Sequence, residues 1–216
     1  MSFAAAELCT QHDGMLLVVT EDTASAERML AETADILGTG ENLLCFPGYE
    51  PLPYDSFAPR QDVISERAEA LYFLLTGKKG VVFVAADTIL QRLPPPEFIV
   101  KSSFIIRKGE ERDPEELRRF LSDSGYLAVE TVMEHGEFSM RGSILDVFPM
   151  GAMHPCRIDF FDTEVDSIRF FDPETQRSDK RGLEGIRILP AREYPTEKDA
   201  IERFRIGYRK LFGASL

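Results

Sequence analysis

The first half of the chain alternates short apolar runs with amphipathic stretches. The apolar runs predict three strands, at Met15–Thr20, Leu43–Phe46 and Gly80–Ala85. The unbroken apolar character of the first and third runs is typical of strands buried on both faces of a parallel sheet. Stretches with apolar residues three or four positions apart predict helices at 22–37, 62–75 and 87–92. This alternation favours βαβ units and a parallel sheet. Between the second strand and the second helix, prolines at 47, 51, 53 and 59 predict an excursion that is neither helix nor central strand.

The pattern changes after the three prolines at 94–96. Residues 98–109 are expected to be extended and to lead into a second domain. Asp113 followed by Pro114 predicts a helix start, because Asp caps helices and Pro is favoured at the first helical position. Short β-branched and aromatic runs bounded by Gly, Pro and Asp then predict hairpin-linked antiparallel strands at 143–148, 157–161 and 167–171. A further strand is expected at 186–189, and an amphipathic helix at 196–212.

Alternation within the antiparallel strands separates two faces. Successive side chains of a strand point to opposite sides, so Ile158, Phe160, Ile168 and Phe170 form an apolar face. The opposite face is more unusual, and it carries Arg157, Asp159, Phe161, Arg169 and Phe171. Two interpretations remain open: an ordinary amphipathic sheet whose Phe161 and Phe171 pack under a loop or helix, or a face that binds a protein partner through arginine and aromatic anchors.

Composition limits the classes of partner. The 216 residues carry a formal net charge of −12, so we expect poor binding to duplex DNA, whose affinity depends on Lys and Arg neutralising phosphates. The three cysteines are widely spaced and odd in number, which suits a reducing, cytoplasmic environment better than a disulfide framework. The sequence has neither a secretory signal pattern nor an apolar run long enough to span a bilayer. Both ends read as cut, and we expect the chain to be a fragment of a larger protein.

Several stretches match known chemical motifs only in part. Gly77-Lys78 stands in the place of a phosphate-binding loop, but Tyr72 replaces the first glycine and Lys79 the hydroxyl residue. The acidic turn at 162–166 lacks the glycine and the final glutamate of a calcium loop. His154 and Cys156 have no second pair of metal ligands nearby. The run 134–137 (Glu-His-Gly-Glu) is interpreted as a strand end and turn, because a helical zinc site needs a second His where Ser139 stands. No catalytic residue, cofactor site or metal site is therefore predicted in this chain.

Two longer strings carry a specific resemblance. MEHGEFSMRGSILDVFPMG, followed by RIDFFDTEVDSIRFFDPETQRS, resembles the interaction domain shared by the excision-repair protein UvrB and transcription-repair coupling factors (Mfd proteins). The upstream PYDSFAPRQDVISER and the downstream ILPAREYPT are closer to the coupling factors than to UvrB. The resemblance covers most of the chain from about residue 43 onward.

The resemblance implies an architecture. It gives a parallel-sheet, helicase-like α/β domain of P-loop type, with degenerate nucleotide machinery, at residues 1–102. A smaller α+β domain with an antiparallel sheet is inserted at 103–189, and residues 190–216 return to the first domain.

The resemblance also implies a function. The inserted domain docks on UvrA, the damage-sensing ATPase, and so recruits nucleotide excision repair to RNA polymerase stalled at DNA damage. The UvrA contacts carried over onto this sequence are Arg141, Arg157 and Phe161, with Asp159 and Arg169 as weaker neighbours. RNA polymerase, DNA, and the ATP and Mg²⁺ of a translocating motor belong to other parts of the parent, one of which is thought to mask the UvrA-binding face intramolecularly.

Three alternatives remain. The chain could be the N-terminal part of UvrB itself, although residues 49–85 leave no room for that protein's DNA-gripping hairpin. It could be an active nucleotide hydrolase, which the missing phosphate motif disfavours. It could also be a structural domain that clamps the motor of its own parent.

Overall fold

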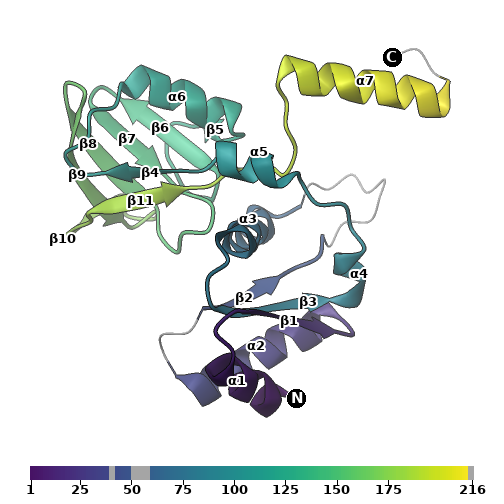
Figure 1. Ribbon diagram of the computed structural model, residues 1–216. Coiled ribbons are helices and arrows are strands. Elements are labelled where there is room, and N and C mark those ends of the chain that lie inside the picture. Colours follow the sequence, from purple (N-terminus) through teal and green to yellow (C-terminus); the bar gives the residue numbers. More distant parts are fainter. Residues whose placement is uncertain (39–41, 50–58, 214–216) are drawn as a thin grey trace.

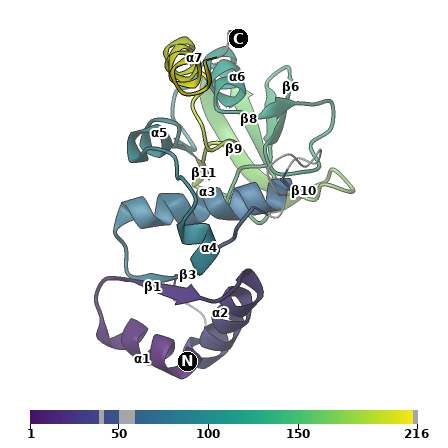
Figure 2. The same cartoon turned by 90° about the vertical axis from the view of Figure 1, so that its right-hand side faces the viewer.

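The computed structural model describes residues 1–38, 42–49 and 59–213. It is a mixed α/β structure in which a three-stranded parallel sheet and a six-stranded, mostly antiparallel sheet lie on opposite sides of helix α3 (Gln61–Thr76). Figures 1 and 2 both show α3 between the two sheets, with the N-terminus below and the C-terminal helix above.

The parallel sheet consists of β1 (Met15–Thr20), β2 (Leu43–Phe46) and β3 (Gly80–Ala85), in the order β1-β3-β2. These are the three strands that the apolar runs predict. All six residues of β3 are buried, as expected for the central strand. Helices α1 (Ser2–Gln11) and α2 (Thr23–Leu37) contact one face, and α3 with α5 (Pro96–Lys101) contacts the other. The start of α2 is fixed by Asp22, whose carboxylate accepts a hydrogen bond from the Ser25 N–H at 2.7 Å.

Three predictions for this half were wrong in detail. We expected β1 to be buried on both faces, but Leu17 and Val19 are about half exposed. The reason is that β1 is an edge strand, and the core on the α3 side is built mainly on β2 and β3. Residues 98–101, expected to be extended, form most of α5, with Pro96 in its first turn and Ile99 buried. Helix α4 (Ala86–Ile89) ends before residue 92. Most of the proline-rich excursion, residues 50–58, lies outside the described residues.

The second sheet has the strand order β10-β9-β8-β7-β6-β5. Its strands are β5 (Leu127–Ala128), β6 (Glu137–Arg141), β7 (Ile144–Val147), β8 (Cys156–Phe161), β9 (Glu164–Phe171) and β10 (Ser178–Gly182). The three predicted strands are confirmed, and β9 begins three residues earlier than expected. Gly142, at φ 61°, provides the left-handed residue in the turn between β6 and β7. The run 134–137 is a turn, as predicted, but it leads into the start of β6 and does not follow the end of a strand. The Glu137 carboxylate accepts the N–H groups of Met133 and Glu134.

One face of this sheet is the main core, which we call the inner face. Helix α6 (Pro114–Asp123) packs on it through Leu117 and Leu121, and Asp113 caps α6 as predicted. A two-stranded ribbon of β4 (Phe104–Arg107) and β11 (Gly185–Ile188) completes the core with Ile106 and Ile188. The opposite face, which we call the outer face, carries a set of charged and aromatic residues: Arg141, Asp146, Arg157, Asp159, Phe161, Arg169 and Phe171.

Residues 189–197 connect β11 to the last helix, and this connection, which we call the strap, is bonded to both parts of the structure. The Tyr126 hydroxyl donates to the Leu189 carbonyl at 2.8 Å, and Glu193 pairs with Arg67 of α3. Helix α7 (Lys198–Phe212) follows and lies on the opposite side of α3 from the parallel sheet (Figures 1 and 2). Most of its apolar side chains, including Phe204 and Phe212, are exposed. The division into domains at 1–102, 103–189 and 190–216 stays a prediction.

Within the described residues, no helix is both long and apolar enough to cross a bilayer.

Candidate partner-binding face

Asp146 of β7 is the centre of the outer face, although its own side chain is only 1% exposed. Its carboxylate accepts three hydrogen bonds from two arginines. Arg157 of β8 donates from Nε at 2.6 Å and from Nη2 at 2.9 Å, and Arg141 of β6 donates from Nη2 at 2.7 Å. Strand register explains the convergence, because Asp146 lies directly opposite Arg157 and next to the β6 strand that ends at Arg141. A buried carboxylate therefore joins two of the arginines predicted to bind a partner.

Each of the three guanidinium nitrogens of Arg157 donates at least one hydrogen bond. Besides its two bonds to Asp146, it donates from Nη1 to the Gln176 carbonyl at 3.2 Å and to the Ser178 hydroxyl at 3.3 Å. Its guanidinium carbon lies 5.0 Å from the centre of the Phe171 ring, and its side chain is 17% exposed. The hydrogen bonds that Arg157 donates to the Asp146 carboxylate raise the pKa of Arg157 above its ordinary value. Most of this side chain is engaged within the sheet, so we expect it to stabilise the fold as well as to contribute charge.

A second ion pair lies on the outer face next to the Arg141–Asp146–Arg157 cluster. Asp159 of β8 pairs with Arg169 of β9, and it also accepts a hydrogen bond from the Ser167 hydroxyl at 2.7 Å. Arg157 and Arg169 are directly opposite each other, a like-charge pairing that destabilises sheets when uncompensated. Here each arginine has its own carboxylate, Asp146 for one and Asp159 for the other. The Arg169 Nε is buried and has no hydrogen-bond partner among the described residues.

The two aromatic residues of the outer face have different environments. Phe161 is 77% exposed at the end of β8, beside the turn into β9. Phe171 is buried with Val132 and Phe148, under the loop that precedes β6. The interpretation that both rings pack under a loop is therefore right for Phe171 and wrong for Phe161. The sheet therefore leaves the Phe161 ring open to solvent at the β8–β9 turn, directly opposite Glu164 and four residues along β8 from Arg157.

All five predicted residues therefore lie on the outer face, but they are not equivalent. Phe161 is the most open, Arg141 is 55% exposed, and Asp159 and Arg169 are partly exposed in their own ion pair. Asp146 was missed by sequence reasoning. The only signal was an acidic residue within the apolar run Ile144-Leu145-Asp146-Val147, at the alternation position that faces the arginines.

Replacing Arg157 with alanine should lower the free energy of unfolding by about 2 kcal/mol, because it removes two bonds from the buried Asp146 carboxylate and leaves only Arg141 to compensate it. A thermal melt measures the change. The exposed Arg177, in the neighbouring turn, provides the control, and Arg177→Ala should melt with the parent. Unchanged melting of Arg157→Ala would show that Asp146 is compensated without it.

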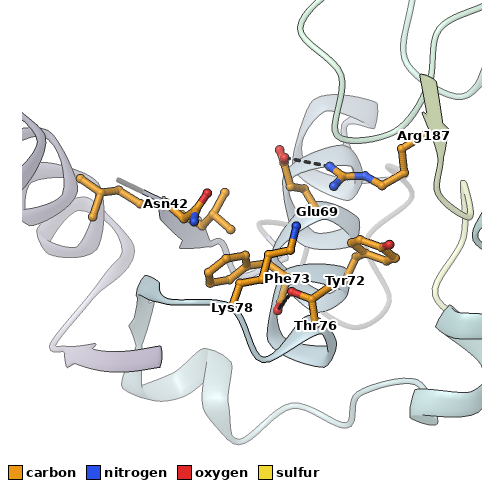
Figure 3. Close-up of a pocket in the computed structure, with 9 residues that line it drawn as sticks. Asn42, Glu69, Tyr72, Phe73, Thr76, Lys78 and Arg187 are labelled. Atoms are coloured by element: carbon orange, nitrogen blue, oxygen red, sulfur yellow. Dashed lines mark hydrogen bonds and ion pairs between the residues drawn. The ribbon is translucent and has the colours of Figure 1, made fainter. Parts of the chain in front are cut away.

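A pocket of about 240 Å³ lies elsewhere, where α3 meets β2 and β11. Glu69, Tyr72, Lys78 and Arg187 are among the residues that line it. Figure 3 shows Glu69 and Arg187 pointing toward each other. They form an ion pair with an N–O distance of 3.2 Å. Burial raises the pKa of Glu69 above its ordinary value. The Arg187 guanidinium also lies 4.8 Å from the centre of the Tyr72 ring. These contacts join β11 to α3, and we interpret the pocket as part of the junction between the two sheets. The described residues contain no group of three or more His, Cys, Asp or Glu side chains that could hold a metal ion.

Comparison with known proteins identifies the class of the antiparallel part. Residues 104–194, which include the whole outer face and the β4–β11 ribbon, match the family described as the UvrB interaction domain. This match confirms the resemblance predicted from the hairpin and strand motifs.

The particular relatives are transcription-repair-coupling factors. The chain is 42% identical to the one from Haemophilus influenzae over 212 residues and 42% identical to the one from Escherichia coli over 207 residues, which is 98% and 96% of the chain. It is 32% identical to the one from Staphylococcus aureus (strain Mu50) over 200 residues. The chain spans only 18% of the length of the first two relatives and 17% of the third.

Proposed function

We propose that this chain is a protein-binding module of a transcription-repair coupling factor and that the outer face binds UvrA. The match to the UvrB interaction domain supports this assignment, as does similarity to transcription-repair-coupling factors along nearly the whole chain. The observation that carries it is Phe161, a ring exposed on the same face of the sheet as the Arg141–Asp146–Arg157 cluster. Immobilised chain should capture purified UvrA through this face.

The geometry suits an interface anchor. Aromatic and arginine side chains dominate the energetics of protein interfaces, and they act best where the surrounding contacts are already ordered. Arg141 and Arg169 are each fixed to an aspartate on the neighbouring strand, so little side-chain entropy remains to be lost on binding. The partner chemistry that fits is an apolar recess for Phe161 with carboxylates beside it.

The proposal extends to the parent protein. We infer that it recruits nucleotide excision repair to RNA polymerase stalled at DNA damage, and that it acts in the cytoplasm as an ATP-dependent DNA translocase. Its ATP, Mg²⁺, DNA and polymerase sites then belong to the part of the parent beyond this chain. In this proposal the parallel sheet is a degenerate P-loop, helicase-like domain that carries the binding domain as an insertion, and another domain of the parent masks the outer face until UvrA is needed.

The second candidate function is nucleotide hydrolysis. We predict that the chain alone hydrolyses no ATP, because its sequence lacks a complete phosphate-binding loop: at Gly77-Lys78, Tyr72 replaces the first glycine and Lys79 replaces the hydroxyl residue that holds Mg²⁺. Steady-state phosphate release by protein free of contaminating ATPases measures this. Release above a buffer blank that scales with protein concentration would reverse the prediction.

A further inference from the structure

We propose that Asp146 is a positioning residue for partner binding. It holds Arg141 in place on the outer face, so that the remaining N–H groups of Arg141 donate hydrogen bonds to a carboxylate of the partner. This inference rests on the proposed function. Asp146 is buried and cannot itself form a large part of an interface, so it acts through the two arginines that it binds.

The two arginines use the carboxylate unequally. Arg157 places Nε and Nη2 on Asp146 and uses Nη1 for Gln176 and Ser178, so four of its five N–H groups have acceptors. Arg141 reaches Asp146 through Nη2 alone. Its Nε and Nη1 have no partner among the described residues. Arg141 therefore retains donors for a second carboxylate while Asp146 fixes its position.

The charge balance favours the same conclusion. Two guanidinium groups share one carboxylate in this cluster, so one positive charge is left uncompensated. Arg157 already neutralises most of the Asp146 charge through a two-bond contact, which makes Asp146 a weak competitor for Arg141. A partner carboxylate can then join Arg141 without displacing Asp146. If Asp146 were instead a competitor, removing its charge would strengthen binding.

The test is a double-mutant cycle on the whole chain, with purified UvrA as the probe. We expect Asp146→Asn to weaken UvrA binding about tenfold in the parent background and less than about threefold in an Arg141→Ala background, because the effect passes largely through Arg141. A purely structural role would give the same factor in both backgrounds. Two controls separate other causes: Glu115→Gln makes the same charge change on α6, on the inner side of the sheet, and Val165→Ala weakens the inner core of the same domain.

A second variant keeps the proposal testable if Asp146→Asn does not fold. Arg141→Lys leaves the Asp146–Arg157 contact intact and preserves the charge, but an ammonium group lacks the planar fork that serves two carboxylates at once. We expect Arg141→Lys to bind UvrA about as weakly as Arg141→Ala. Parent-like binding by Arg141→Lys, equal factors in the cycle, or tighter binding by Asp146→Asn would each overturn the positioning role. Failure of the unaltered chain to bind UvrA would instead overturn the proposed function.

Discussion

Replacing Arg67 with alanine should destabilise the chain by about 3–5 kcal/mol, because it leaves the Glu193 carboxylate buried without its cation. Arg67 is fully buried in α3 and binds Glu193 through two bonds, Nε to Oε1 at 2.5 Å and Nη2 to Oε2 at 3.0 Å. It also donates from Nη1 to the Pro47 carbonyl at 2.6 Å. Its guanidinium carbon lies 4.3 Å from the ring centre of Phe46 and 4.1 Å from that of Tyr49. The side chain thus joins α3, the end of β2 and the strap before α7.

Chemical denaturation monitored by circular dichroism measures this loss. The matched control is Arg118→Ala on α6, which breaks an exposed pair with Glu115 at 2.9 Å and should cost less than about 1 kcal/mol. Glu193→Gln should fall between the two, because it keeps the shape of the site but leaves the Arg67 charge buried. If Arg67→Ala and Arg118→Ala unfolded at the same denaturant concentration, the Arg67–Glu193 contact would not hold the strap.

The sequence predicted most of the strands and helices because their signals are local. Continuous apolar runs gave β1, β2 and β3, and the Asp113-Pro114 start gave α6. The errors depend on tertiary context. Leu17 and Val19 are exposed because β1 lies at the sheet edge, which its own residues do not encode. The apolar residues of α5 are equally compatible with a strand or a helix when only six residues are available.

The candidate site was predictable only in part, for the same reason. Alternation places Arg157, Asp159, Phe161 and Arg169 on one face, and the structure confirms that they share it. Alternation cannot distinguish Phe161 from Phe171, because the loop that covers Phe171 comes from residues 129–132, far away in the sequence. The partners of Arg157 were also hidden, since they come from β7, from the turn before β10 and from the first residue of β10. The structure therefore separates the side chains that hold the face together from those that remain open on it.

Phe161→Ala should reduce the affinity for UvrA by about thirtyfold or more, which corresponds to at least ~2 kcal/mol. The ring is exposed in the free chain, so truncating it removes apolar area that the proposed interface would bury while leaving the inner core intact. The thermal melt of the variant should therefore match that of the parent. Phe3→Ala provides a matched control, because Phe3 of α1 is equally exposed but lies on the far side of the parallel sheet from the outer face.

The most direct test of the account is the dissociation constant for purified UvrA, measured by biolayer interferometry on the immobilised parent chain, Phe161→Ala and Phe3→Ala. We expect saturable binding by the parent and by Phe3→Ala, with little or no binding by Phe161→Ala at the same concentrations. Equal binding by all three variants, with coincident thermal melts, would contradict the claim that the outer face is the UvrA-binding surface.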